Sequence, residues 1–288
     1  MPSNAPLLSV IIPSYKMGPY IGDALASIGH QSYPHWEVLV VDDCGPEDGT
    51  RAAVESFATA HPGKRVVYIR HEQNGGVSKA RNTAIAAATG DYCGFLDPDD
   101  LWQPSFAARM MSAFADEANV QVVCSPMQAF RMENGVKVPE RDLYFETWQT
   151  RRFPQSLALA NFIQPSGVVC ATSVLRALGG FDEDPKIQHV EDYDLWIRLA
   201  QAGNVFCFVN EIHSGYRKHI GAATSNAGKM ARRQEALANK HSGFFIAGQA
   251  VMLNAIMHRM TARDAAIKNP LRWLAGKYFK TGRRLGKS

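Results

Sequence analysis

GDYCGFLDPDDLW, residues 90–102, begins as an apolar run and stops abruptly at three carboxylates, Asp97, Asp99 and Asp100. An apolar run bounded by a glycine and an acidic cluster predicts a buried strand that carries carboxylates at its carboxyl end. In open α/β sheets, ligands bind outside the carboxyl ends of the strands. The stretch therefore predicts both a strand of an α/β sheet and a ligand site at its end.

The three carboxylates allow two interpretations. Acidic side chains this close together repel one another unless a cation neutralises them, and oxygen ligands suit Mg²⁺ or Mn²⁺. The alternative is an acidic loop that caps the next helix, with Asp100 near the helix N-terminus. This stretch alone does not decide between a metal site and a helix cap.

Strand and helix patterns alternate along the first part of the chain. Apolar runs typical of strands lie at 7–13, 36–43 and 65–71. Segments with helical spacing of apolar residues lie at 20–31, 49–61 and 78–89. Strands that alternate with helices of this length predict βαβ units and a mostly parallel sheet.

The pattern is less regular in the second part of the chain. A helix over roughly 104–118 and a strand over 120–127 are expected. Residues 131–165 show no clean period and are interpreted as an irregular excursion. A strand and a helix follow within 166–184, then a helix with an acidic first turn at 190–203 and a late strand at 205–219. After about residue 225 the chain is expected to be helical.

Composition limits the class of protein. At 288 residues, with 46% hydrophobic and 20% charged residues, the chain can bury a large core and wholesale disorder is excluded. The five cysteines are far apart and form no CxxC pair, so neither a disulfide framework nor a zinc site is indicated. No signal peptide pattern and no apolar stretch of ~20 residues is present, and we expect a cytoplasmic protein.

The positive charge is concentrated at the C-terminal end. Seven basic and no acidic residues follow residue 267, namely Lys268, Arg272, Lys277, Lys280, Arg283, Arg284 and Lys287. Without them the formal net charge of +4 becomes −3. Two interpretations stay open for 268–288: a helix drawn peripherally to anionic lipid at the inner face of a membrane, or a solvated tail or oligomer contact.

Acidic residues recur at strand ends and helix starts. Besides the opening stretch, these are Asp42 and Asp43 after the second strand, and Glu191 and Asp192 at the helix predicted over 190–203. The first two groups should converge on one crevice, because successive parallel strands end at the same edge. Neither a Walker loop nor a dinucleotide fingerprint is present. The phosphates of a bound nucleotide would then need a metal held by the carboxylates.

Five motifs, SVIIPSY, VVDDCGPEDGT, NGGVSKARNTAI, FLDPDD and VEDYDLWIRL, occur in the order and spacing found in family 2 inverting glycosyltransferases with the GT-A fold. The segment GYRKH also resembles the end of their catalytic domain, so the resemblance covers about residues 7–221. It implies a Rossmann-like, mostly parallel sheet flanked by helices. The implied organisation is a nucleotide-sugar half at 1–125, an acceptor and catalytic-base half at 126–225, and a helical extension at 226–288.

The resemblance also implies a nucleotide-sugar site. Asp43 matches the residue that binds the imide of a uracil or related base, and Pro13 and Tyr15 match the turn beside the base and ribose. Asp97 matches the first acid of the Asp-x-Asp motif, near the ribose or donor sugar. Arg81 lies in a region that supports the nucleotide pocket. The structural alternatives are a turn or cap role for Asp43 and a salt bridge for Arg81.

Metal and base positions follow from the same resemblance. Asp99 matches the acid that binds the divalent metal on the diphosphate, and His219 matches a position that supplies a further metal ligand in some members. Asp192 matches the catalytic base of the ED motif, whereas Asp194 matches a helix-supporting residue. The alternative for Asp192 is a carboxylate that merely favours the helix dipole. For His219 the alternative is a structural or surface histidine.

The implied activity is a metal-dependent, inverting transfer of a sugar from a nucleotide diphosphate donor, most simply a UDP-sugar, with Mn²⁺ or Mg²⁺. The acceptor would be a hydroxyl of a glycan or lipid-linked glycan in cell-envelope polysaccharide or lipopolysaccharide synthesis, and no nucleic acid takes part. A sugar-nucleotide nucleotidyltransferase is a second possibility, but PSYKMGPY at 13–20 is a poor phosphate loop. A non-catalytic carbohydrate-binding protein should have lost one of the acidic groups, and none is lost.

Overall fold

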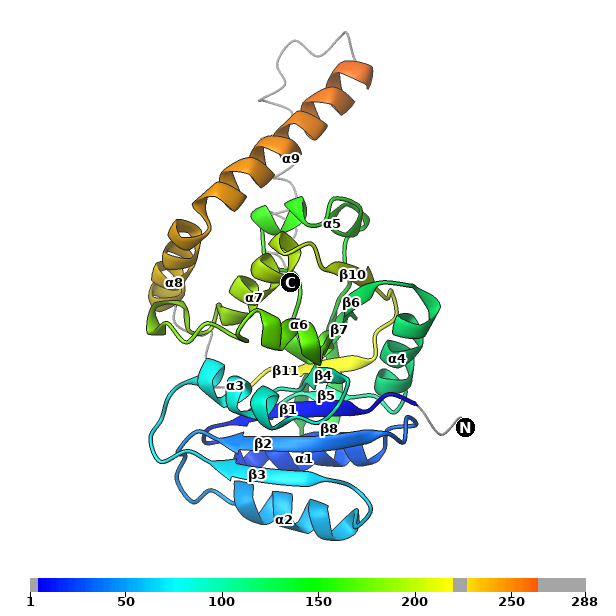
Figure 1. Cartoon of the computed structure of the whole chain (residues 1–288), viewed down its shortest axis with the longest axis vertical. Helices are drawn as coiled ribbons and strands as arrows, with labels where there is room; N and C mark the ends of the chain where they lie inside the picture. Colours follow the sequence, from blue (N-terminus) through cyan, green and yellow to red (C-terminus); the bar gives the residue numbers. More distant parts are fainter. Residues whose placement is uncertain (1–4, 220–226, 264–288) are drawn as a thin grey trace.

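A seven-stranded sheet runs through the middle of the molecule (Figure 1). The structure is a computed structural model that describes residues 5–219 and 227–263. From edge to edge the strands are β10 (Val205–Phe208), β6 (Val120–Cys124), β9 (Val168–Ala171), β4 (Tyr92–Phe95), β1 (Leu8–Ser14), β2 (Trp36–Asp42) and β3 (Val66–Arg70). Neighbouring strands are parallel except at β9, which is antiparallel to both β4 and β6. The mostly parallel sheet predicted from the sequence is confirmed.

Helices cover both faces of this sheet, because each buried strand points alternate side chains to opposite sides. On β1, Val10 and Ile12 belong to one apolar cluster and Ile11 belongs to the other. The first face is covered by α1 (Gly18–Gly29), α2 (Thr50–Ala60) and α4 (Phe106–Asp116). The second is covered by α3 (Val77–Ala87), α6 (Thr172–Ala177) and α7 (Glu191–Gln201). This is the Rossmann-like layering that was expected.

A second sheet corrects the expectation of an irregular segment over 131–165. Its strands, in order, are β5 (Leu101–Trp102), β11 (Ser214–Arg217), β7 (Met127–Glu133) and β8 (Val136–Leu143). β7 and β8 form a hairpin through Asn134 and Gly135, whose φ angles are 50° and 78°. An Asn-Gly pair is a strong hairpin signal, but the exposed, polar side chains of β8 hid the strand pattern around it. Besides α6, short helices lie between β8 and α7. They are α5 (Thr147–Arg151), η1 (Gln155–Ala158), η2 (Pro165–Gly167) and η3 (Pro185–Ile187).

The strand predicted over 205–219 is in fact two strands in two sheets. β10 pairs with β6 in the central sheet, whereas β11 pairs with β5 and β7 in the second. The polar residues between Val209 and Ser214 allow the chain to cross from one sheet to the other. His219, two residues beyond β11, therefore reaches the edge where the acidic stretch lies.

The acidic stretch is itself a junction between the sheets, since β4 belongs to the first and β5 to the second. Trp102 of β5 folds back over β4, and a Cβ on Gly94 would come within 2.9 Å of the indole ring. The Trp102 indole N–H donates a hydrogen bond to the carbonyl oxygen of Ser166 at 2.8 Å. Packing on both sides thus fixes the backbone that carries the carboxylates.

Two helices follow the second sheet, α8 (Ala227–Lys240) and α9 (Ser242–Arg263), as expected for this part of the chain. Leu237 of α8 is buried in the apolar cluster that also contains α7. In Figure 1, α9 extends away from the rest of the molecule. Among the described helices, none has the length and apolar character needed to cross a bilayer. The basic segment 268–288 lies outside the described residues.

Candidate active site

Arg81, on α3, joins the acidic stretch to the start of α7. Its Nη2 donates to Asp97 Oδ1 at 2.8 Å, and its Nη1 donates to Glu191 Oε1 at 2.6 Å. The side chain is only 3% exposed and its guanidinium lies 5.0 Å from the ring centroid of Phe181. Burial lowers the pKa of Arg81, but its two carboxylate partners outweigh burial and raise it. The salt bridge considered for Arg81 is therefore present, and it brings together three segments that are distant in sequence.

Asp192 is the second residue of α7, next to the ion-paired Glu191. Asn161 Nδ2 donates a hydrogen bond to Asp192 Oδ2 at 2.9 Å. Burial, together with the negative charge of Glu191, raises the pKa of Asp192 to about 7. A carboxyl group with a pKa near neutrality is suited to accept a proton from a substrate.

Asp99 and His219 face each other at the end of the acidic stretch. His219 Nε2 lies 2.9 Å from Asp99 Oδ2, and the Tyr20 ring lies beside the imidazole with centroids 4.7 Å apart. Burial and the charge of Asp97 raise the pKa of Asp99, although His219 opposes the shift. The ionised form of Asp99 is therefore costly in this environment, and a bound cation would offset that cost.

A divalent metal fits this pair as part of a ligand set. Among the described residues, no group of three or more His, Cys, Asp or Glu side chains is placed to hold a metal alone. Metal ions that act on nucleotides are commonly held by one or two protein ligands, with substrate phosphates and water completing the shell. Asp99 and His219 supply one oxygen and one nitrogen, a donor set that accepts Mn²⁺ more readily than Mg²⁺.

Asp43 holds the glycine loop that leads into α3. Its Oδ1 accepts hydrogen bonds from the Gly75 N–H at 2.9 Å and from His71 Nδ1 at 2.7 Å. Its Oδ2 accepts one hydrogen bond, from the Gly76 N–H at 2.7 Å. Each carboxylate oxygen can accept about two hydrogen bonds. The turn at Gly45 is held instead by Asp42, whose Oδ1 accepts a hydrogen bond from the Gly45 N–H at 2.8 Å. Oδ2 of Asp43 keeps the capacity to accept a further donor.

Pro13 and Tyr15, at the end of β1, differ in how far their side chains are exposed. Pro13 is buried within β1, which ends at Ser14 rather than at Pro13 as expected. Tyr15 lies just beyond the strand and is 41% exposed, and Lys16 Nζ lies 5.0 Å from its ring centroid. Of the two predicted residues, Tyr15 has the side chain that is free to meet a ligand.

The sequence model of glycosyl transferase family 2 matches residues 9–178, more than half of the chain. The chain belongs to glycosyl transferase family 2. It is 30% identical to the putative teichuronic acid biosynthesis glycosyltransferase TuaG of Bacillus subtilis, over 79% of this chain and 85% of that protein. It is 29% identical to the UDP-Glc:alpha-D-GlcNAc-diphosphoundecaprenol beta-1,3-glucosyltransferase WfgD of Escherichia coli, over 79% of this chain and 83% of that protein.

Solved structures of glycosyltransferases resemble this family 2 enzyme in fold. TarS 1-349 of S. aureus, in complex with UDP-GlcNAc, superposes with a TM-score of 0.59 at 26% identity. The match covers 77% of this chain and 61% of the TarS chain. The mannosyltransferase PcManGT of Pyrobaculum calidifontis, in complex with GDP-Man and Mn²⁺, gives a TM-score of 0.60 over 99% of this chain and 81% of its own. At 20% identity the latter shows the fold alone.

Asp100 of this glycosyltransferase is not a helix cap, and the capping interpretation was wrong. β5 separates it from α4, which begins at Phe106. Asp100 is 2% exposed, and it accepts hydrogen bonds from the Ser166 hydroxyl at 2.6 Å and the Arg217 N–H at 2.9 Å. Arg217 Nε also donates to the carbonyl oxygen of Asp99 at 2.7 Å. Burial, followed by the charges of the neighbouring aspartates, raises the pKa of Asp100 well above its usual range.

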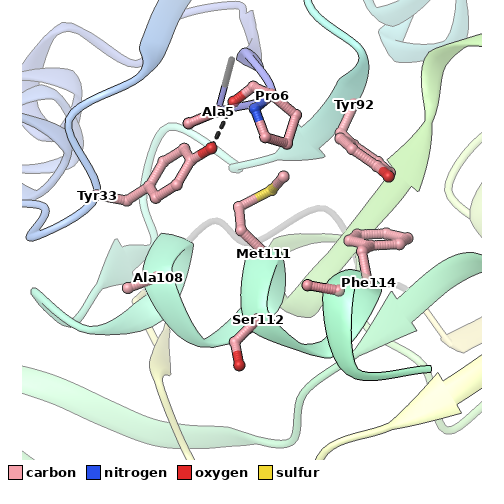
Figure 2. A pocket seen from close by; sticks show the side chains of 9 residues that line it. Ala5, Pro6, Tyr33, Tyr92, Ala108, Met111, Ser112 and Phe114 are labelled. Carbon is pink, nitrogen blue, oxygen red and sulfur yellow. Dashed lines mark hydrogen bonds between the residues drawn. The ribbon is translucent and has the colours of Figure 1, made fainter. Parts of the chain in front are cut away.

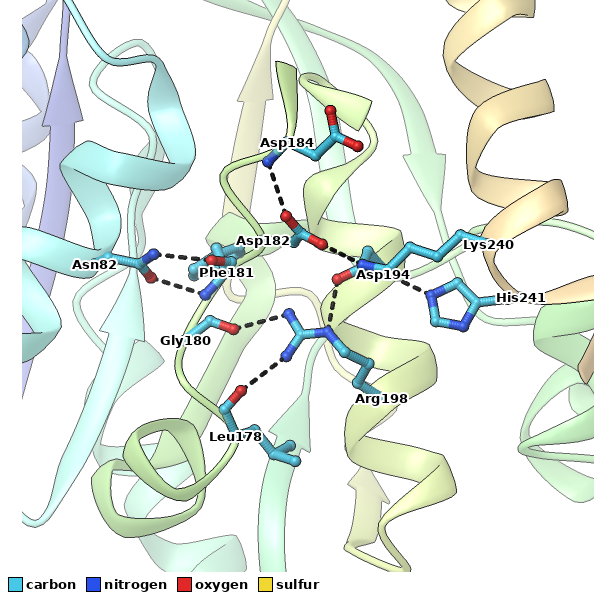
Figure 3. A network of polar contacts seen from close by, with 10 residues as sticks. All are labelled: Asn82, Leu178, Gly180, Phe181, Asp182, Asp184, Asp194, Arg198, Lys240 and His241. Carbon is cyan, nitrogen blue, oxygen red and sulfur yellow. Dashed lines mark hydrogen bonds and ion pairs between the residues drawn. The ribbon is translucent and has the colours of Figure 1, made fainter. Parts of the chain in front are cut away.

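Asp194 anchors the C-terminal helices of the glycosyltransferase to α7 (Figure 3). Its fully buried carboxylate accepts hydrogen bonds from Arg198 Nε at 2.7 Å and from Lys240 Nζ at 2.5 Å. His241 Nε2 lies 2.8 Å from the same carboxylate, and Lys240 also pairs with Asp182. We call these five residues the α7 clasp. The helix-supporting role expected for Asp194 thus extends to α8, whose last residue is Lys240.

A hollow of about 320 Å³ lies elsewhere on the family 2 domain (Figure 2). Its lining is mostly apolar and includes Pro6, Tyr33, Tyr92 and Met111, and the Tyr33 hydroxyl donates to the Pro6 carbonyl at 2.5 Å. Pro6 precedes β1 and Tyr92 begins β4, so the hollow lies at the amino ends of the parallel strands. It is at the opposite edge from the carboxylates described above and forms no part of this site.

Sequence reasoning missed several residues that hold the site of this glycosyltransferase. Asn161 and Ser166 lie in or beside a segment without a clean period, so no sequence signal marked them. Arg217 lies within the quoted GYRKH segment, where only His219 had been singled out. His71 follows β3, and its position at a strand end was the available signal, because acidic residues at the neighbouring strand ends had already been selected for that reason.

Proposed function

We propose that this enzyme transfers a sugar from a UDP-sugar to a hydroxyl group of a glycan or lipid-linked acceptor, with inversion at the anomeric carbon. The names of two relatives support this choice of substrates, since TuaG is assigned to teichuronic acid biosynthesis and WfgD to UDP-Glc and a diphosphoundecaprenol acceptor. The complex of TarS with UDP-GlcNAc supports the same donor class. The product would be part of a cell-envelope polysaccharide or lipopolysaccharide.

The observation that carries this proposal is the bridge from Asp97 through Arg81 to Glu191. Asp97 belongs to the stretch assigned to the donor, whereas Glu191 immediately precedes the candidate base, Asp192. One buried guanidinium fixes both carboxylates. A sugar held at Asp97 would therefore lie close to Asp192, which is the arrangement that a direct displacement requires.

In the proposed reaction, Asp192 accepts the proton of the acceptor hydroxyl while the acceptor oxygen bonds to the anomeric carbon. The bond from that carbon to the phosphate oxygen breaks on the opposite face, and the nucleoside diphosphate leaves with the electron pair. Asn161 holds Oδ2 of Asp192 by a hydrogen bond and so orients the carboxylate, and we assign Oδ1 to the acceptor hydroxyl. The charge of Glu191 raises the proton affinity of Asp192, so that the base is stronger than an ordinary carboxylate.

We assign Asp99 and His219 to hold Mn²⁺ or Mg²⁺ against the donor diphosphate. A bound metal supplies positive charge that stabilises the departing diphosphate. The closeness of Asp99 to His219 and the raised pKa of Asp99 support this assignment. Arg217 holds the Asp99 backbone in place through its hydrogen bond to the carbonyl oxygen.

The nucleoside would lie at the ends of β1 and β2. We assign the remaining capacity of Asp43 Oδ2 to the imide N–H of the base, with Tyr15 and the backbone at Pro13 beside the base and ribose. Asp97 would accept hydrogen bonds from hydroxyl groups of the ribose or the donor sugar. Arg81 would act by holding Asp97 rather than by touching the nucleotide, because both of its Nη atoms are already bonded to carboxylates.

We also propose that the basic segment 268–288 brings the enzyme to an anionic membrane surface at the cytoplasmic side. The segment contains seven basic residues and no acidic ones, and a lipid-linked acceptor would lie at such a surface. Contact of this kind is peripheral and depends on salt.

The donor assignment can be tested by measuring the thermal stability of the purified enzyme with UDP-, GDP- and dTDP-sugars, each with and without Mn²⁺. We expect UDP-sugars to raise Tm more strongly when Mn²⁺ is present. The Asp99→Asn variant should lose the additional rise in Tm that Mn²⁺ causes. If no nucleotide sugar stabilises the enzyme under either condition, the proposed function is wrong.

The base assignment can be tested with Asp192→Asn. We expect it to lower transfer by about 10³-fold, within the usual range for loss of a general base, while UDP raises Tm as in the unchanged enzyme. Asp116→Asn, which alters an exposed carboxylate on α4, is the matched control and should transfer normally. Loss of UDP binding in Asp192→Asn would show that Asp192 belongs to the donor site instead.

A further inference from the structure

Left-handed backbone conformations cluster around the candidate active site. In the described part of the chain, the non-glycine residues with positive φ are Lys16, Cys44, Asn119, Asn134 and His189. The two asparagines are unremarkable, because asparagine adopts this conformation readily. The other three lie just after β1, just after β2 and shortly before α7. Strained backbone of this kind gathers at functional sites, where the surrounding structure maintains it.

His189 is the member of this group nearest to the candidate base. Its φ is 66°, a conformation that costs a residue with a side chain about 1 kcal/mol and costs glycine almost nothing. Glycine would therefore stabilise the backbone better at this position. The reason for a histidine must lie in what its side chain does.

The imidazole of His189 lies among charged groups from four parts of the fold. Glu191, Arg233, Arg81 and Asp97 all act on it electrostatically. Burial lowers the pKa of His189, so the ring is neutral at neutral pH. A neutral imidazole offers one N–H donor and one acceptor nitrogen. It is half-buried and, within the described residues, it makes no hydrogen bond of its own.

The turn that carries His189 is held from two sides. Ile187 is buried in the apolar cluster beneath it. The Gln188 amide packs directly against Gly76, where a Cβ would overlap with it. Gly76 in turn is held by Asp43. The turn on either side of His189 is therefore packed against the core and against the loop that leads to the nucleotide-binding edge.

We propose that the His189 imidazole hydrogen-bonds a hydroxyl group of a sugar at the reaction centre and thereby helps to select that sugar. A hydroxyl both donates and accepts, which matches the two nitrogen atoms of a neutral ring. The inference rests on the proposed function, since it places a sugar between Asp97 and Asp192. The hydroxyl belongs either to the donor sugar or to the acceptor, and the test below separates the two sources.

His189→Gly tests this role because it keeps the backbone conformation and removes only the side chain. We expect the variant to fold with an unchanged or higher Tm, yet to show kcat/KM for transfer reduced by 10- to 100-fold. His189→Asn should recover part of this loss, because asparagine tolerates the same backbone and retains one donor and one acceptor. Asn119→Gly is the matched control, an exposed left-handed residue between α4 and β6, and it should leave transfer unchanged.

The kinetic pattern identifies the hydroxyl. A contact with the donor sugar would change the rate ratio between UDP-glucose and UDP-galactose and the KM for the donor, whereas a contact with the acceptor would raise the acceptor KM alone. UDP by itself should raise Tm equally in both proteins. If the unchanged enzyme transfers sugar and His189→Gly does so with the same kcat and KM values, the inference is overturned while the proposed function stands. If the unchanged enzyme transfers no sugar, the proposed function itself is wrong, and the inference that rests on it is wrong as well.

Discussion

A carboxylate that acts as a base must first lose its own proton. Because burial and the charge of Glu191 raise the pKa of Asp192 to about 7, we expect kcat to fall about tenfold per pH unit below pH 7 and to level off above it. Transfer rates at saturating substrates between pH 5 and 9 measure this directly. Asn161→Ala removes a hydrogen bond that lowers this pKa and should move the acidic limb to higher pH. A limb centred near pH 4 in the unchanged enzyme would contradict the assignment.

The same residue should lower stability at alkaline pH. The pKa of Asp192 is about 7 in the folded enzyme and near 3.8 in an ordinary setting, so the folded state binds more protons between these pH values. Its contribution to the free energy of unfolding therefore falls as the pH rises from about 4 to about 7. Asp192→Asn removes that loss, and we expect it to raise Tm more at pH 8 than at pH 5. Asp116→Asn should show no such difference, and an equal change at both pH values in Asp192→Asn would refute the argument.

At the scale of elements, the sequence predicted the helices and strands that have a clear apolar pattern. Buried parallel strands such as β1 and β2 are continuous apolar runs, and their flanking helices have one clear apolar face, so both were evident. The strand β8 was not evident from the sequence, because its side chains are largely exposed and do not alternate clearly between apolar and polar. The split of residues 205–219 into β10 and β11 was also hidden, since a change of sheet leaves the strand propensity intact on both sides.

The residues of the candidate site also divide into those that the sequence could predict and those that it could not. Residues at the ends of parallel strands, such as Asp43 and Asp97, were predictable because topology alone brings those ends together. Asn161 and Ser166 were not, because they reach the site from irregular backbone whose path depends on tertiary contacts. Arg81 was selected as a binding residue, yet its two carboxylate partners could be recognised only once α3 and α7 were placed together.

The α7 clasp predicts how firmly the C-terminal helices are attached. Asp194 is fully buried, and its replacement by asparagine would leave Lys240 and Arg198 without their shared carboxylate. Breaking a buried ion pair in this way costs roughly 3 kcal/mol. We therefore expect Asp194→Asn to lower the free energy of unfolding by about that amount in a urea titration. Removing the exposed ion pairs of Arg131 with Glu133 and Glu140 by Arg131→Ala should have a much smaller effect, and similar effects for the two variants would contradict this account.

At the scale of the whole molecule, Arg81, Asp194 and Arg217 connect separate parts of the fold through ion pairs and hydrogen bonds. Arg81 links α3 and the acidic stretch to α7, and Asp194 links α7 to α8. Arg217 links the second sheet to the acidic stretch and, through Asp23, to α1. The site is therefore not a feature of one element, and a displacement of any layer should alter the positions of the carboxylates.

Charge is divided unevenly over the same molecule, and this division predicts where the enzyme works. The seven basic residues of 268–288 leave the remainder of the chain with a formal net charge of −3, so the proposed contact with an anionic surface is assigned to the end of the chain. Each basic residue near such a surface contributes about 1 kcal/mol at low salt. The full chain should therefore sediment with vesicles that contain phosphatidylglycerol, but not with vesicles of phosphatidylcholine alone.

Deletion of 268–288 should abolish this sedimentation while leaving kcat and KM for a water-soluble acceptor unchanged. A full-length variant with the seven basic residues replaced by glutamine is the matched control, because it keeps the length of the segment and removes only its charge. If charge is the cause, the glutamine variant should behave like the deletion, and 0.5 M NaCl should release the unchanged enzyme, because the Debye length at about that ionic strength is only a few ångströms. Equal vesicle binding by the full chain and the deletion would show that another surface makes the contact.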